Sequence, residues 1–201
     1  MSSITTTVGD VVLAVLVGYL IGSIPIANLV ARRRGVGDLR NVGDRNPGFW
    51  NARESLGRAA AIPVFVGDVA KGVAAGGVGL ALADDGVWGI PVVAAGAAMV
   101  GHAFPVFARF RGGRSVLTFV GGAAVFAPVA VALAVGVLLV VFAVTRSFAH
   151  AARAGMIALP LIQLVVDGPF RTAATGALMT LIGLRFAQAT LSDRRVTLGQ
   201  R

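Results

Sequence analysis

Seven apolar segments run through this chain, and they constrain its fold more than any other feature. They lie at 10–31, 59–83, 87–108, 115–127, 129–145, 154–167 and 172–191. A helix needs about 20 apolar residues to cross a bilayer. Only 13% of the residues are charged, whereas soluble domains carry about 25%. The sequence therefore predicts an all-α integral membrane protein with about seven transmembrane helices, organised as a single membrane domain over residues 1–201.

Two of the segments, 115–127 and 154–167, are shorter than a straight span requires. They are either half-helices or parts of helices that extend into the flanking residues. Only Ala127-Pro128 separates the fourth segment from the fifth. A single kinked span over 115–145, which would leave six spans, is therefore an alternative.

The distribution of arginine favours seven spans. With seven spans and the N-terminus outside, sixteen of the seventeen arginines fall in the inside loops and the tail, and Arg171 is the exception. Cytoplasmic loops are enriched in Lys and Arg, so we expect the N-terminus outside and the C-terminus in the cytoplasm. The same bias explains the net charge of +9 without a nucleic acid as partner.

Metal and thiol chemistry have little support in the residue content. The chain has no cysteine and two histidines, His102 and His150. Disulfides and thiolate nucleophiles are excluded, and a histidine-built metal centre lacks ligands. We expect no metal site.

The stretch 101–118 combines a helix end with features of an anion site. Arg111 and Arg114 bracket Gly112-Gly113. Glycine allows the backbone N–H groups to approach a ligand, and guanidinium groups match phosphate oxygens. The alternative is a positively charged inside loop with a flexible glycine hinge.

The inside loop 32–58 is rich in turn residues between 41 and 51. Its polar groups are the amides of Asn41, Asn46 and Asn51 and the guanidiniums of Arg40 and Arg45. Such a set can hold a small polyol phosphate, or the loop is an ordinary solvated connection. Phe49-Trp50 favours burial or a membrane-interface position.

Asp68 and Lys71 lie within the second apolar segment at i, i+3 spacing, on one helical face. Ionisable groups inside a span are costly, and they are either paired or functional. Both an internal ion pair and a contribution of Lys71 to the anion site remain open at this point.

Four motifs occur in order along the chain, and together they resemble one family. They are Gly-Tyr-Leu-Ile-Gly-Ser-Ile-Pro (18–25), Arg-Asn-Val-Gly-x-x-Asn-x-Gly-x-x-Asn (40–51), Asp-x-x-Lys-Gly (68–72) and Gly-His-x-Phe-Pro-Val-Phe-x-x-Phe-x-Gly-Gly (101–113). The pattern is similar to that of the bacterial acyl-phosphate:glycerol-3-phosphate acyltransferases, the PlsY family. The resemblance covers nearly the whole chain and is strongest over 18–118.

This resemblance implies a reaction and a location. The family transfers a fatty acyl group from acyl phosphate to the sn-1 hydroxyl of glycerol 3-phosphate, and it needs no cofactor. The products are lysophosphatidic acid and phosphate, in phospholipid biosynthesis. The implied location is the bacterial inner membrane, with the active site on the cytoplasmic face. The expected partners are the two small-molecule substrates and membrane lipid.

The motifs and the anion-site residues together define a candidate site. We expect catalytic roles for His102, Arg114, Asn46 and Asn51. We expect phosphate binding by Arg40, Arg45, Arg53, Lys71, Arg111, Gly112, Gly113 and Ser115.

Several positions depart from the family pattern. The serine, threonine and arginine of the family's first loop are replaced by Asp44, Trp50 and Glu54. The histidine and asparagine of its third motif are replaced by Phe186 and Ala189, which cannot form the same hydrogen bonds. Three functions therefore stay open: an active acyltransferase with a remodelled site, a catalytically impaired or altered-specificity paralogue that binds a lipid or polyol phosphate, and a small transporter.

Overall fold

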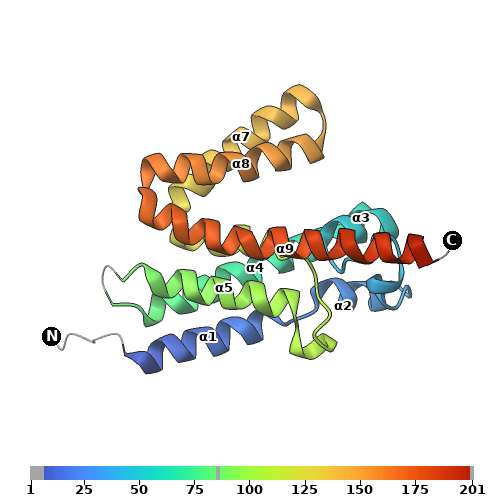
Figure 1. Ribbon diagram of the computed structural model, residues 1–201, viewed down its shortest axis with the longest axis horizontal. Coiled ribbons are helices and arrows are strands. Elements are labelled where there is room, and N and C mark those ends of the chain that lie inside the picture. The colour runs from blue at the N-terminus through green and yellow to red at the C-terminus, as the bar shows by residue number, and fades with distance from the viewer. Residues whose placement is uncertain (1–6, 85–86, 200–201) are drawn as a thin grey trace.

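The structure is a computed structural model that describes residues 7–84 and 87–199, with side chains described as far as Leu191. Every regular element within these ranges is a helix (Figure 1). The elements are α1 (Val8–Gly22), α2 (Ile26–Arg33), the 3-10 turn η1 (Leu39–Asn41), α3 (Phe49–Leu56), α4 (Arg58–Leu82), α5 (Gly89–Ala103), the 3-10 turn η2 (Val106–Ala108), α6 (Val116–Phe126), α7 (Pro128–Thr145), α8 (Phe148–Val166) and α9 (Pro169–Gly199).

Five helical stretches among the described residues are long and apolar enough to cross a membrane. They are Val8–Arg33, Arg58–Leu82, Gly89–Ala108, Pro128–Thr145 and Phe148–Val166. The all-α prediction is confirmed. The count of seven full-length spans and the orientation of the termini stay predictions.

The two short apolar segments have different outcomes. Segment 154–167 is part of the 19-residue helix α8, which begins at Phe148 and is long enough to span. Segment 115–127 forms α6, which has 11 residues. At a rise of about 1.5 Å per residue, α6 covers about half of a bilayer. The expectation that 115–127 is a half-helix or extends into its neighbours is thus resolved in favour of a short helix that ends at the Ala127-Pro128 turn.

Helix α4 is the centre of the bundle, because α1, α3, α5 and α6 all pack against it. Figure 1 shows α1, α4 and α5 side by side, with α9 lying against α5. The α7–α8 hairpin stands apart, and its large apolar side chains are mostly exposed. Exposed apolar side chains suit a surface that faces lipid rather than water.

Small residues allow the helices of this bundle to approach closely. A Cβ on Gly72 of α4 would overlap the carbonyl oxygen of Thr118 in α6. A Cβ on Gly22 of α1 would overlap the carbonyl oxygen of Ala98 in α5. Glycine and alanine at such contacts let backbones meet, and packing then stabilises the bundle where lipid offers no hydrophobic driving force.

Replacing Gly72 with alanine should lower the thermal stability of the bundle, because the added methyl group forces α4 away from α6. Gly77→Ala is the matched control, since Gly77 lies in the same helix with nothing within 4 Å of its Cβ position. That change should be neutral or should stabilise by up to about 1 kcal/mol. Melting curves of both variants in the same detergent test this. Equal effects of the two substitutions would contradict the close α4–α6 contact.

Candidate active site

The first membrane stretch is broken between α1 and α2, and this break forms one wall of the candidate site. Proline at position 25 has no N–H to continue the α1 ladder, and it disfavours helical geometry at Ile24. The chain therefore leaves α1 at Gly22 and enters α2 at Ile26. The backbone N–H groups of Ala27 and Asn28 have no acceptor within the described part of the chain, and no side chain caps the helix. The positive end of α2 is thus open.

A buried charged cluster faces this break. Lys71 Nζ lies 3.0 Å from Asp68 Oδ1 and donates to the carbonyl oxygen of Ile24 at 3.2 Å. His102 Nδ1 lies 3.5 Å from the same Asp68 oxygen. All three side chains are at least nine-tenths buried. The internal ion pair considered from the sequence is present, and it places the ammonium group at the unwound turn.

The Gly112-Gly113 pair packs against the end of α5. Gly112 N–H donates to the Ala103 carbonyl at 3.1 Å, and Gly113 N–H donates to the His102 carbonyl at 3.0 Å. The expectation that these N–H groups are free for a ligand is therefore wrong. A Cβ on either glycine would overlap an atom of His102. Glycine is required here by the close approach of the loop to His102.

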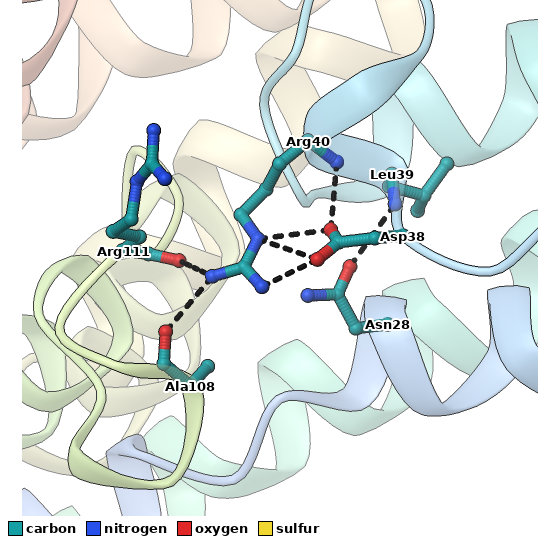
Figure 2. A network of polar contacts seen from close by, with 6 residues as sticks. All are labelled: Asn28, Asp38, Leu39, Arg40, Ala108 and Arg111. Carbon is teal, nitrogen blue, oxygen red and sulfur yellow. Dashed lines mark hydrogen bonds and ion pairs between the residues drawn. The ribbon is translucent and has the colours of Figure 1, made fainter.

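Arg40 ties two loops together (Figure 2). Its Nη1 donates to the carbonyl oxygens of Ala108 at 2.8 Å and Arg111 at 3.2 Å. Its Nε and Nη2 donate to the Asp38 carboxylate. The hydrogen bond from Arg40 holds the pKa of Asp38 below its usual value. Arg40 is thus engaged in a loop-to-loop clasp, and phosphate binding by this residue stays a prediction.

Two other predicted site residues make internal hydrogen bonds. Asn51 is fully buried, and its Nδ2 donates to the carbonyls of Leu39 and Val42, both at 2.9 Å. Ser115 donates from Oγ to the Met99 carbonyl at 2.7 Å, at the start of α6. Both side chains hold loops in place in this structure.

Arg114 and Arg185 meet beside the glycine pair. Arg114 Nη1 lies 3.0 Å from Asp44 Oδ2, and its guanidinium stacks 4.6 Å over the Phe186 ring. Arg185 donates to the carbonyls of Gly112 at 2.9 Å and Gly113 at 3.2 Å. Sequence reasoning did not place Arg185 in the site. The available signal was its position at the start of the family's third motif.

The remaining residues of the first inside loop lie elsewhere. The Arg53 guanidinium lies 5.1 Å over the ring of Trp50, which in turn stacks on Phe148 at 6.3 Å. Arg45 is exposed, and Asn46 donates its backbone N–H to Asp44. None of these three predicted site residues lines the pocket described next. The aromatic contacts of Phe49 and Trp50 confirm that these rings are packed rather than free.

A small, partly open pocket lies between the α1–α2 break, the end of α5 and the glycine pair, and Arg40, Arg114 and Arg185 are not among its lining residues. The predicted site residues that it brings together are Lys71, His102, Arg111, Gly112 and Gly113. The first turn of α2, Asp68 and Pro47 complete the wall. Cationic side chains and an open helix N-terminus both attract anions. In residues 7–84 and 87–191, no group of three or more His, Asp or Glu side chains could hold a metal ion.

The Asp38–Arg40 clasp should make stability depend on pH at acid values. A carboxyl whose pKa is lower in the fold than in the unfolded chain stabilises above the unfolded pKa of about 4. That contribution disappears as pH falls through the folded pKa. We therefore expect Asp38→Asn to lower the melting temperature at pH 7 by about 2 °C. The difference from the unchanged protein should vanish well below pH 4, and a gap that persists there would contradict the assignment.

This chain is similar in sequence to known proteins over most of its length. A family model described as glycerol-3-phosphate acyltransferase matches residues 12–191. A glycerol-3-phosphate acyltransferase of Rhizobium etli is 34% identical over 180 residues, which cover 89% of this chain and 85% of that protein. One from Rhizobium meliloti is 37% identical over 167 residues, which cover 82% of this chain and 79% of that protein.

Solved structures agree with these sequence relationships. The crystal structure of PlsY (YgiH), an integral membrane glycerol 3-phosphate acyltransferase, in its glycerol 3-phosphate form superposes with a TM-score of 0.78. The two chains are 28% identical, and the match covers 96% of this chain and 94% of that one. The lysophosphatidic acid form of the same protein gives a TM-score of 0.75 at 25% identity, with the same coverage. The chain belongs to the glycerol-3-phosphate acyltransferase family of integral membrane enzymes.

Proposed function

We propose that this protein transfers a fatty acyl group from acyl phosphate to the sn-1 hydroxyl of glycerol 3-phosphate. The observation that carries the proposal is the pocket in which Lys71 and His102 lie beside the open N-terminus of α2, with Arg111 also in its lining. A phosphate ester fits this combination of cations and backbone donors. The related PlsY structures in glycerol 3-phosphate and lysophosphatidic acid forms support the same substrate and product.

The reaction suits a site without a nucleophilic side chain. Acyl phosphate is an activated mixed anhydride. The glycerol hydroxyl oxygen attacks the acyl carbonyl carbon, the bond from that carbon to the phosphate oxygen breaks, and the leaving phosphate accepts the hydroxyl proton. What the protein must supply is the positioning of two anions and the stabilisation of their charge. Arg111 and Arg114 carry that role in our proposal, together with Lys71.

His102 packs between neighbouring residues at the site. The His102 ring lies between Asp68 on one side and Gly113 on the other. Arg185 then fixes the glycine pair from α9. The His102 carbonyl accepts the Gly113 N–H in the loop that carries Arg111 and Arg114, so we assign His102 a positioning role as well as contact with substrate.

The contacts between loops support a cytoplasmic site. Arg40 binds the loop after α5, Trp50 stacks on Phe148 at the α7–α8 turn, and Arg185 binds the glycine pair. The arginine-bearing connections therefore meet at one end of the molecule, where Figure 1 places α2, α3 and the C-terminal half of α9. We propose that this end faces the cytoplasm of the bacterial inner membrane, with the N-terminus outside. Arg194, Arg195 and Arg201, which the sequence places on the same side, have side chains outside the described residues.

Trp88 and Arg171 mark the opposite end of the bundle. Arg171 lies over the Trp88 ring at 5.4 Å and within 3.9 Å of Asp167. Trp88 Nε1 donates to the Phe126 carbonyl at 3.3 Å. An aromatic residue with a polar handle is typical of a membrane interface, so we assign this cluster to the outer surface.

A paralogue that binds phosphate without turnover is the second candidate. The observation that favours it is the replacement of hydrogen-bonding groups by Phe186 and Ala189 on α9. Loss of such groups removes transition-state stabilisation. This candidate predicts binding of glycerol 3-phosphate with no formation of lysophosphatidic acid.

Acyl transfer is tested with purified protein in lipid nanodiscs, palmitoyl phosphate and glycerol 3-phosphate, by measuring both phosphate release and lysophosphatidic acid. We expect turnover, and we expect Arg114→Ala to lower kcat/KM by roughly 100-fold because a charge-stabilising donor is lost. Arg171→Ala, which removes an arginine from the opposite end, should leave turnover unchanged. An inactive wild-type protein beside an active relative would reject the acyltransferase proposal and favour the second candidate.

We expect Lys71 to contribute both to the stability of the fold and to the binding of glycerol 3-phosphate. Lys71→Met removes the ammonium partner of the buried Asp68 and leaves only His102 beside it, so we expect a loss of about 3–5 kcal/mol of stability. The double variant Asp68→Asn with Lys71→Met removes both charges and should regain much of that stability. It should still bind glycerol 3-phosphate weakly in a calorimetric titration. Recovery of full affinity in the double variant would exclude Lys71 from the anion site.

A further inference from the structure

The Arg114 guanidinium lies between Phe186 and Asp44. The ring of Phe186 covers one face at 4.6 Å. The Nε atom is buried and has no hydrogen-bond partner among the described residues. Asp44 Oδ2 lies 3.0 Å from Nη1, where both side chains remain partly exposed at 22% for Arg114 and 30% for Asp44. Asp44 therefore occupies Nη1 of a guanidinium that is only partly buried.

Asp44 is presented to Arg114 by a constrained turn. Its Oδ1 accepts the backbone N–H of Asn46 at 3.1 Å. Gly43 and Arg45 on either side have φ angles of 55° and 58°. A non-glycine residue such as Arg45 adopts this left-handed region at a cost in free energy. The segment 43–45, called the latch below, thus holds a carboxylate in place by local geometry.

We infer that Asp44 is an intramolecular competitor of the substrate phosphate for Arg114. In the empty site the carboxylate pairs with the guanidinium, and a phosphate ester must displace it to bind. Carboxylates and phosphates use the same guanidinium donors, and two anions at one edge repel each other. The inference rests on the proposed function, because it takes this site as the one that receives glycerol 3-phosphate.

A phosphate monoester gains more from Arg114 than a carboxylate does. A phosphate monoester carries more charge than a carboxylate and has three acceptor oxygens. It can replace Asp44 at Arg114, whereas a monoanionic carboxylate gains nothing over the residue already there. The latch therefore lowers the affinity for every anion that must displace Asp44 from Arg114.

The first test measures binding of inorganic phosphate and glycerol 3-phosphate by calorimetry in nanodiscs. We expect Asp44→Asn to bind both about tenfold more tightly, a change of about 1.4 kcal/mol. Asp44→Ser is a second variant with a smaller side chain and should show the same direction. Asp167→Asn is the matched control, because it removes a carboxylate that also pairs with an arginine, Arg171, at the other end of the bundle.

A double variant separates competition at Arg114 from a general charge effect. If Asp44 acts through Arg114, then Asp44→Asn should give no gain in affinity when it is added to Arg114→Ala. If it only adds negative potential to the site, the gain should remain. The gain remaining in the double variant would overturn the inference.

The other outcomes are equally decisive. Unchanged or weaker phosphate binding in both Asp44 variants overturns the competition, and so does absence of phosphate binding in all variants. Acyl transfer by the unchanged protein together with unaltered affinity in Asp44→Asn would keep the proposed function and reject the latch. Tighter phosphate binding in Asp44→Asn without acyl transfer would keep the latch and reject the proposed function.

Discussion

The site depends on a buried ion pair that holds open a break in the first membrane helix. Lys71 pairs with Asp68 and donates to the carbonyl of Ile24, in the turn between α1 and α2. A charge inside a membrane bundle must be paired, and an unwound carbonyl must find a donor. One ammonium group meets both demands. The same contact directs the open end of α2 into the pocket, next to His102.

Arginine has two separate uses at the end of the molecule where the loops meet. Arg40 and Arg185 bind backbone carbonyls and so fix the loop between α5 and α6. Arg111 lines the pocket, and Arg114 pairs with Asp44. The forked guanidinium suits both uses, because it offers five donors in a fixed geometry. The density of positive charge therefore reflects loop architecture as well as anion recognition.

Two of the family positions that differ in this chain, 44 and 186, are physically linked through Arg114. Asp44 and Phe186 both contact Arg114, one at its edge and one at its face. An arginine stacked on an aromatic ring and paired with a carboxylate is a coherent local arrangement. These two substitutions thus lie together around Arg114, whereas Trp50 contacts Arg53 and Phe148.

The sequence by itself determined the all-helical membrane class, the apolar segments and the family, since hydropathy and ordered motifs are local properties of the chain. It also singled out five of the residues that line the pocket. Only the tertiary structure decided the rest. The amides of Gly112 and Gly113 are used by the end of α5, Arg40 is used by a neighbouring loop, and Arg53 lies over Trp50. Hydrogen bonds between segments about 70 residues apart depend on how the helices pack. A motif of a dozen residues therefore does not show which of its hydrogen-bond donors will be paired within the folded protein.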